Sequence, residues 1–214
     1  MVNGSLWPIT VRKPVNVVSL VVLVTVLVSW HWMHRRDKET LMLSPHAVKH
    51  HREWHRVLTH AFVHADWMHL AFNMFVLYEF GQTVARDLHG LGWLGFPALY
   101  VAGIAGGAWP ALQKHGDHPG YRSLGASGAV SAVLLAFICL HPTHTLLLFF
   151  IIPVPAVLAG VLFFWYESRM QQRQTTRIAH DAHLGGALVG AAWAFVFVPN
   201  AWPAFVESLR GLLG

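Results

Sequence analysis

Long stretches without any Asp, Glu, Lys or Arg place the strongest constraint on the fold of this chain. Four of them cover residues 15–33, 91–112, 123–140 and 145–166. Residues 67–84 carry only Glu79, and 182–202 are again free of these four residue types. A helix of roughly 20 apolar residues crosses the hydrocarbon core of a bilayer. The pattern therefore predicts six membrane spans at these positions.

The six stretches leave little room for a soluble domain. Charged residues make up 12% of the chain and hydrophobic residues 55%, whereas soluble domains carry about 25% charge. We expect an all-α polytopic membrane protein in which residues 1–214 form one domain with a long first loop at 34–66. A signal peptide is the alternative for the first stretch. Its length and the lack of a small-residue cleavage site after it favour a span.

Counting crossings brings several polar residues to one side of the membrane. In a chain with six spans, the N-terminal ends of the second, fourth and sixth spans share one face. The residues at these ends are His69, Asn73, Ser127 and His183. Polar groups at membrane depth are costly and usually face a bundle interior or a water-filled cavity. We therefore expect these four residues to form one site.

Ser127 and His183 form the chemically most informative pair. A serine hydroxyl becomes a good nucleophile when a base removes its proton, and histidine is the usual base near neutral pH. A helix-packing serine and an interfacial histidine are the alternatives. Asp181 lies two residues from His183, on a different side of a helix. The sequence therefore favours a Ser–His dyad over a triad.

His69 and Asn73 are four residues apart and share one helix face. Their N–H groups, with the backbone N–H of Ser127, could stabilise a developing oxyanion. A polar pair that bonds to a neighbouring helix is the alternative reading.

Small residues recur every four positions in the fourth and sixth spans. Gly128 with Ala132, and Gly186 with Gly190, form small-xxx-small patterns, which are typical of helices in close contact. With Gly125 they are expected to pack helices around the site and to bring Ser127 within reach of His183.

Other functions receive less support. The basic residues sit in short loops, so nucleic-acid binding is not expected. Histidines are abundant in the first loop, but no His-Glu-x-x-His occurs, and we expect no metal or other cofactor. A transporter is disfavoured because the polar residues gather at one face.

Five segments, in order along the chain, resemble motifs of the rhomboid family of intramembrane serine proteases, of the bacterial type with a six-span core. They are Glu53–His64, His69-Leu-Ala-Phe-Asn73, Gly125-Ala-Ser127-Gly128, residues 150–156 and Ala182–Gly190. The resemblance covers nearly the whole chain.

This resemblance implies a six-helix bundle whose catalytic cavity opens to one face. It implies that Ser127 attacks a backbone carbonyl, that His183 acts as base and then acid, and that the Ser127 amide, Asn73 and His69 form the oxyanion hole. Substrates would be single-span or multi-span membrane proteins in the lipid bilayer, cut near the membrane surface. A rhomboid-like protein that binds transmembrane helices without cleaving them is the alternative. No oligomeric state is implied.

Two features depart from the family pattern. Many members place an aromatic ring four residues after the serine, stacked on the histidine, whereas this chain has Ser131; a hydrogen bond from Ser131 could orient His183 instead. The face that carries the site also holds 11 of the 15 Lys and Arg, which favours a cytoplasmic site by the positive-inside rule. The family orientation, in a bacterial inner membrane with an extracytoplasmic site, is the one we expect.

Overall fold

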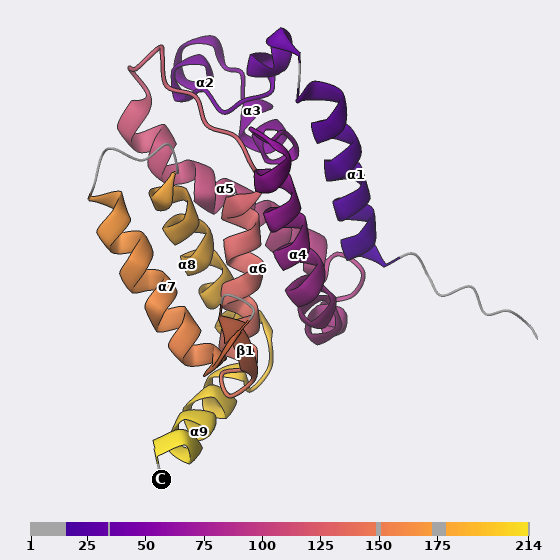
Figure 1. Ribbon diagram of the computed structural model, residues 1–214, viewed down its shortest axis with the longest axis vertical. Helices are drawn as coiled ribbons and strands as arrows, with labels where there is room; N and C mark the ends of the chain where they lie inside the picture. Colours follow the sequence, from indigo (N-terminus) through magenta and orange to yellow (C-terminus); the bar gives the residue numbers. More distant parts are fainter. Residues whose placement is uncertain (1–15, 34, 149–150, 173–178, 214) are drawn as a thin grey trace, which may run out of the picture.

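The structure, a computed structural model, describes residues 16–33, 35–148, 151–172 and 179–213. This part of the chain is mostly helical (Figure 1). The helices are α1 (Val17–Trp32), α2 (Pro45–His51), α3 (Arg56–Thr59), α4 (Trp67–Asp87), α5 (Gly95–His115), α6 (Ser127–Leu140), α7 (Ala156–Gln171), α8 (His180–Phe197) and α9 (Ala201–Leu213). Short 3-10 turns are η1 (Arg36–Thr40), η2 (His60–Phe62) and η3 (Leu88–Leu91), and one hairpin joins β1 (Thr145–Leu148) to β2 (Ile152–Pro155).

Helix α6 is the centre of the bundle. It contacts α4, α5, α7 and α8, and nearly all of its residues from Gly128 to Cys139 are buried. Helix α1 lies outside, against α4. In Figure 1, α4, α6 and α8 all begin at the upper side of the bundle, next to the segment that holds α2 and α3. The helix starts that carry the expected site residues therefore share one face.

Glycines let α5, α6 and α8 approach to backbone contact. A Cβ atom on Gly186 would overlap the carbonyl oxygen of Gly128, and one on Gly190 would overlap that of Ala132. Because these two contacts are one turn apart on both helices, α6 and α8 run parallel and in fixed register. Helix α5 packs into the same seam, where a Cβ on Gly107 would lie 2.9 Å from the Cα of Gly128.

The fifth expected span, 145–166, does not begin as a helix. Its first part forms the antiparallel hairpin, in which Thr145 pairs with Pro155 and Leu148 with Ile152. Pro153 and Pro155 have no N–H to donate, and proline inside a helix clashes with the preceding turn. Helix α7 consequently starts at Ala156, immediately after the second proline, and continues beyond 166 to Gln171.

The sixth expected span, 182–202, is divided in two. Helix α8 starts earlier, at His180, and ends at Phe197, and α9 begins at Ala201. The break contains Pro199 and Asn200, and Asn200 has a φ of 59°, a left-handed conformation that ends a helix. The chain turns sharply here, so α9 leaves the bundle (Figure 1).

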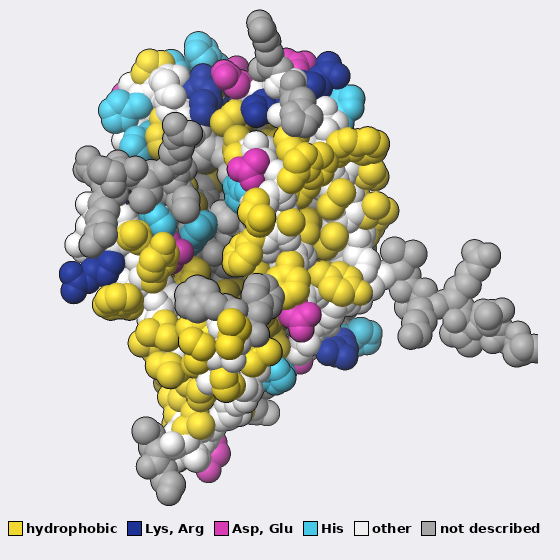
Figure 2. Space-filling view, in the orientation of Figure 1, with side chains coloured by type: hydrophobic (Ala, Val, Ile, Leu, Met, Phe, Trp, Pro, Cys, Tyr) yellow, Lys and Arg dark blue, Asp and Glu magenta, His cyan; other side chains and the backbone are white. Residues whose placement is uncertain are grey.

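No described helix meets the length and hydropathy expected of a membrane span by itself. Two consecutive pairs meet them only together: Trp67–Leu91 with Gly95–His115, bent by 115°, and His180–Phe197 with Ala201–Leu212, bent by 107°. Helices α1 and α6 are apolar but shorter. The expected count of six spans is thus not confirmed. Figure 2 shows hydrophobic side chains over most of one face, with charged side chains at its upper end and a few more along its edges.

Contact between α6 and α8 predicts the effect of adding one methyl group. Gly186→Ala should force the helices apart and destabilise the fold by about 2 kcal/mol or more, as expected for overpacking of a tight interior. The measurement is the free energy of unfolding in detergent. Gly211→Ala is the matched control, because nothing lies within 4 Å of the added Cβ. Equal stability of the two variants would contradict this packing.

Candidate active site

Ser127 and His183 lie at the same height on two touching helices. Ser127 is the first residue of α6, one position before Gly128, and His183 is three positions before Gly186 on α8. Since Gly128 and Gly186 meet, the register offsets the two residues by only about 3 Å along the helix axes at 1.5 Å per residue. Both are half-buried. The glycine seam therefore brings the expected nucleophile and base to one end of the bundle.

The turn before Ser127 requires glycine. Gly125 has a φ of 116°, where a side chain is strained. A Cβ there would also lie 2.7 Å from Cε1 of His69. Gly125 was expected to pack helices together; instead it forms the turn into α6 and supports the His69 ring.

The segment between α1 and α4 bonds to the turn before Ser127 and fixes it. Leu43 and Ser123 form an antiparallel backbone bridge. The N–H of Gly125 donates to the carbonyl of His60 over 2.9 Å. The N–H of Ala126 donates to Nε2 of His64 over 3.3 Å. Backbone groups of three residues just ahead of Ser127 are thus fixed by residues far away in the sequence.

The role of His64 assigns its tautomer. Its Nε2 accepts from Ala126, so the proton of the neutral ring is on Nδ1, which lies 2.8 Å from Oγ of Ser29. That hydroxyl in turn donates to the carbonyl of Phe62 over 2.9 Å. His64 is 1% exposed, and this chain of bonds requires it to be uncharged.

Arg56 organises the same segment. Its guanidinium pairs with Glu53 and donates to the carbonyls of Glu39 and Met42. The salt bridge holds the pKa of Glu53 below its usual value. Arg56 therefore fixes the segment that leads into Leu43 and its bridge to the turn before Ser127.

His69 and Asn73 lie on one face of α4, as their spacing implies. The N-cap Asp66 accepts from the backbone N–H of His69. Asn73 is buried, and its Nδ2 donates one hydrogen to the carbonyl of His69 over 2.9 Å. An amide nitrogen has two hydrogens, and within the described part of the chain the bond of Nδ2 to His69 uses one of them. The first N–H groups of α6 are available, because helix starts leave them unpaired within the helix.

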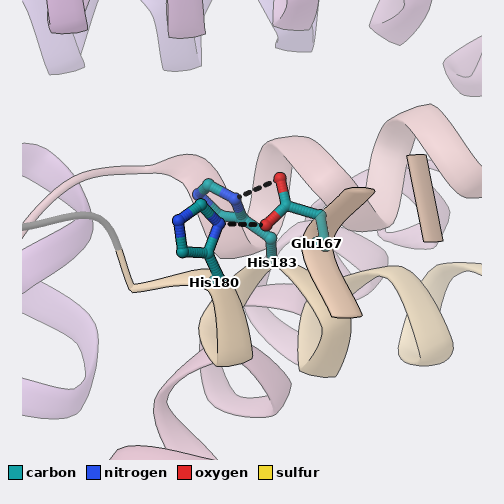
Figure 3. A group of neighbouring side chains, drawn as sticks. All are labelled: Glu167, His180 and His183. Atoms are coloured by element: carbon teal, nitrogen blue, oxygen red, sulfur yellow. Dashed lines mark hydrogen bonds and ion pairs between the residues drawn. The ribbon is translucent and has the colours of Figure 1, made fainter. Parts of the chain in front are cut away.

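A carboxylate from α7 contacts His183 in the structure. Oε1 of Glu167 lies 3.0 Å from Nδ1 of His183, and Oε2 lies 2.6 Å from Nδ1 of His180. Figure 3 shows the carboxylate of Glu167 on α7 facing the two imidazoles of α8, with one of its oxygens joined to each ring. The side chains of Glu167 and His180 are 7% and 3% exposed, and that of His183 is 17% exposed. This is a buried polar cluster joined to the expected base.

The sequence reasoning missed Glu167 and His180. Glu167 directly follows the charge-free residues 145–166 and so lies just outside the expected span, but α7 continues through it. His180 precedes His183 by three residues, so the two share a helix face. The spacing of the histidines was a usable signal. The position of Glu167 depends on where the hairpin lets α7 begin, which the sequence pattern did not reveal.

The same three side chains are a possible metal-ligand set. One ligand atom from each of Glu167, His180 and His183 lies within 4.8 Å of the others, and two histidines with a glutamate are a known zinc set. Each imidazole Nδ1 is, however, at hydrogen-bonding distance from the carboxylate. In this structure the two Nδ1 atoms and the two carboxylate oxygens are hydrogen-bond partners of one another.

Two other polar residues, Asp181 and Ser131, do not bond to His183 in the described structure. Asp181 pairs with Lys114 at 3.2 Å, in agreement with the interpretation that it points to another side of the helix. Ser131 is buried in α6. Among the described side chains, the hydrogen-bond partner of Nδ1 of His183 is Glu167 and not Ser131.

Comparison with known sequences assigns a family to most of the chain. The Rhomboid domain matches residues 51–200. RHOMBOID-like protein 12, mitochondrial, of Arabidopsis thaliana is 39% identical over 156 residues, which cover 65% of this chain and 46% of that protein. Rhomboid protein 1, mitochondrial, of Saccharomyces cerevisiae is 34% identical over 149 residues, 65% of this chain and 40% of that protein.

The relatives bear on two expectations about origin. Rhomboid-like protein 11, chloroplastic, of Arabidopsis thaliana is 29% identical over 168 residues, 69% of this chain and 55% of that protein. The chain spans about half the length of these relatives. Their names are mitochondrial or chloroplastic, so they support neither the bacterial type nor a bacterial inner membrane.

The buried histidines before α4 predict a pH-dependent stability. Burial lowers the pKa of His60 to about 4 and that of His64 to about 3. Unfolding restores the ordinary value near 6.5. Between pH 6.5 and 4 the unfolded chain therefore binds more protons, and the free energy of unfolding should fall as pH falls, by up to about 1.4 kcal/mol per pH unit for each histidine.

Thermal unfolding in detergent at several pH values between 4 and 7.5 measures this slope. In His64→Gln the amide oxygen can still accept from Ala126, but the side chain takes up no proton. The free energy of unfolding should then change less steeply with pH, by the contribution of one histidine. An unchanged slope would show that His64 is not a neutral acceptor in the folded protein.

Proposed function

Because this chain belongs to the rhomboid family, we propose that it is an intramembrane serine endopeptidase in which Ser127 is the nucleophile and His183 the base. Rhomboid proteins are integral membrane proteins, and the family generally consists of serine proteases, although some members are inactive. One observation carries the proposal: backbone contact between Gly128 and Gly186 holds Ser127 and His183 at the same height on parallel helices.

The proposed reaction uses only groups of this chain and water. Oγ of Ser127 attacks the substrate carbonyl carbon while Nε2 of His183 takes the hydroxyl proton. The imidazolium then gives that proton to the leaving amine as the peptide bond breaks, which leaves an ester on Ser127. A water molecule, deprotonated by the same nitrogen, hydrolyses the ester and restores the enzyme.

The negative oxygen of both tetrahedral intermediates would be held at the start of α6. The backbone N–H of Ser127 lies at the positive end of the helix dipole. The ring of His69 lies against Gly125 in the turn before Ser127, and Nδ2 of Asn73 donates to the carbonyl of the same His69. We propose these three groups as the oxyanion hole. No cofactor takes part in the proposed reaction.

Substrates are proposed to be single-span or multi-span membrane proteins, cut near the membrane surface. Large apolar side chains are exposed on several helices of the bundle, among them Phe72, Trp109, Trp165 and Val196. Such a surface suits lipid and apolar helices. The six-span arrangement and an active site on the extracytoplasmic side of its membrane are part of this proposal.

Loss of either reacting group predicts loss of cleavage. Ser127→Ala and His183→Ala should each lower the rate of cleavage of a model transmembrane substrate by at least about 10³-fold, while the thermal stability stays near that of the wild type. A fluorophosphonate probe should label the wild type but not Ser127→Ala. Ser131→Ala and His89→Ala are the matched controls, a buried serine one turn further along α6 and an exposed histidine.

A non-catalytic protein that binds transmembrane helices gives the opposite result. Substrate would then co-purify uncleaved with both the wild type and Ser127→Ala, and the probe would label neither. Full cleavage by Ser127→Ala would also refute the proposal.

The side of the membrane that the site faces is tested separately. Reporter fusions that distinguish the two compartments, placed in residues 34–66 and after α9, should report an extracytoplasmic first loop and a cytoplasmic C-terminus. The basic residues of the first loop favour the reverse. A cytoplasmic first loop would overturn the proposed orientation and leave the proposed chemistry intact.

A further inference from the structure

The buried carboxylate of Glu167, on α7, lies where a side chain could orient the proposed base His183. Position 131, one turn after Ser127, is a serine, which provides no ring to stack on His183. The contact that the structure gives to the back of His183 is Oε1 of Glu167, 3.0 Å from Nδ1. We propose that Glu167 is a positioning residue that fixes the tautomer and orientation of His183; this inference rests on the proposed protease function.

The hydrogen bond determines which nitrogen of His183 is basic. A carboxylate accepts and does not donate, so Nδ1 of His183 must carry the proton. Nε2 then holds the free lone pair, which is the nitrogen that takes the proton of Ser127. Without the carboxylate the ring of His183 can adopt both neutral tautomers. The tautomer with the proton on Nε2 is inactive, because that nitrogen then has no lone pair to take the proton of Ser127.

Burial strengthens the same contact during the reaction. When His183 takes the proton of Ser127 it becomes a cation, and Glu167 lies against it with a side chain only 7% exposed. Opposite charges attract more strongly where water is scarce. The carboxylate thus stabilises the imidazolium without touching the substrate.

His180 holds the carboxylate in place. Its Nδ1 donates to Oε2 over 2.6 Å, and its side chain is 3% exposed. The two oxygens of Glu167 are therefore each occupied by one imidazole, both from the first turn of α8. Nε2 of His180 is buried and has no hydrogen-bond partner among the described residues. His180 acts on the site through the carboxylate alone.

Because Glu167 is on α7, its contact with His183 depends on the position of α7 relative to α8. Ser127 and His183 are fixed by the glycine seam of α6 and α8, which does not involve α7. The bond from Glu167 forms only while α7 lies against α8. A movement of α7 away from α8 would leave the two reacting residues in register but release the orientation of the base.

Three substitutions of Glu167 test the proposal, measured as kcat and KM for cleavage of a model transmembrane substrate in detergent with EDTA present. Glu167→Gln has nearly the same shape, but its NH2 group can donate to one imidazole and so stabilise the wrong tautomer. We expect kcat to fall at least about 100-fold with KM changed less than about threefold, because Glu167 does not touch substrate.

Glu167→Asp retains a carboxylate and should recover at least about tenfold in kcat over Glu167→Gln, whereas Glu167→Ala should not. Asp181→Asn is the matched control. It removes an acidic group from the turn of α8 that carries His180 and His183, but Asp181 pairs with Lys114 and not with either histidine. Its kcat should stay near that of the wild type. The rate of fluorophosphonate labelling of Ser127 should follow kcat across the series.

Other outcomes overturn the inference in distinguishable ways. If Glu167→Gln keeps kcat within about threefold while Ser127→Ala is inactive, the protease function stands and the positioning role fails. If all three variants lose activity together with thermal stability, and Glu167→Asp rescues nothing, the carboxylate only clamps α7 to α8. Activity lost in EDTA and restored by Zn²⁺ would assign the three side chains to a metal ion. A wild type that neither cleaves nor reacts with the probe would refute the proposed function itself.

Discussion

Contact between the backbones of α6 and α8 is the constraint on which the rest of the site depends. Where two helices touch through Gly128 and Gly186, side chains cannot act as spacers, and the register cannot slip without overlap of atoms. Packing at this contact sets the relative positions of a serine and a histidine at the starts of two helices. The polar side chains that α4 and α7 contribute near these two residues are therefore not needed to keep α6 and α8 in contact.

The sequence predicted well what depends on short spacing. The positions of Ser127 and His183 at helix starts follow from apolar stretches, the shared face of His69 and Asn73 from a spacing of four, and the small residues of α6 and α8 from their four-residue repeat. These features are local or recur along one helix. The family resemblance, carried by motifs such as Gly125-Ala-Ser127-Gly128, is confirmed by the match to residues 51–200.

Several features that depend on the meeting of distant segments were not predicted. An apolar run containing Pro153 and Pro155 has the composition of a span, but the prolines turn it into a hairpin and move the start of α7. That shift places Glu167 inside the bundle rather than in a loop. The bonds from His60 and His64 to the turn before Ser127 join residues more than 60 positions apart, and no local pattern indicates them.

The order of these groups along the chain also bears on how the protein is made. The supports for the turn lie before residue 65, the nucleophile lies at 127, and the carboxylate and the base follow at 167 and 183. While the chain is being synthesised, a protein that has reached only α6 carries a serine with no base beside it. The proposed activity therefore arises only after α8 has been inserted and packed, which prevents the immature protein from cutting the membrane proteins, including copies of itself, that surround it during biogenesis.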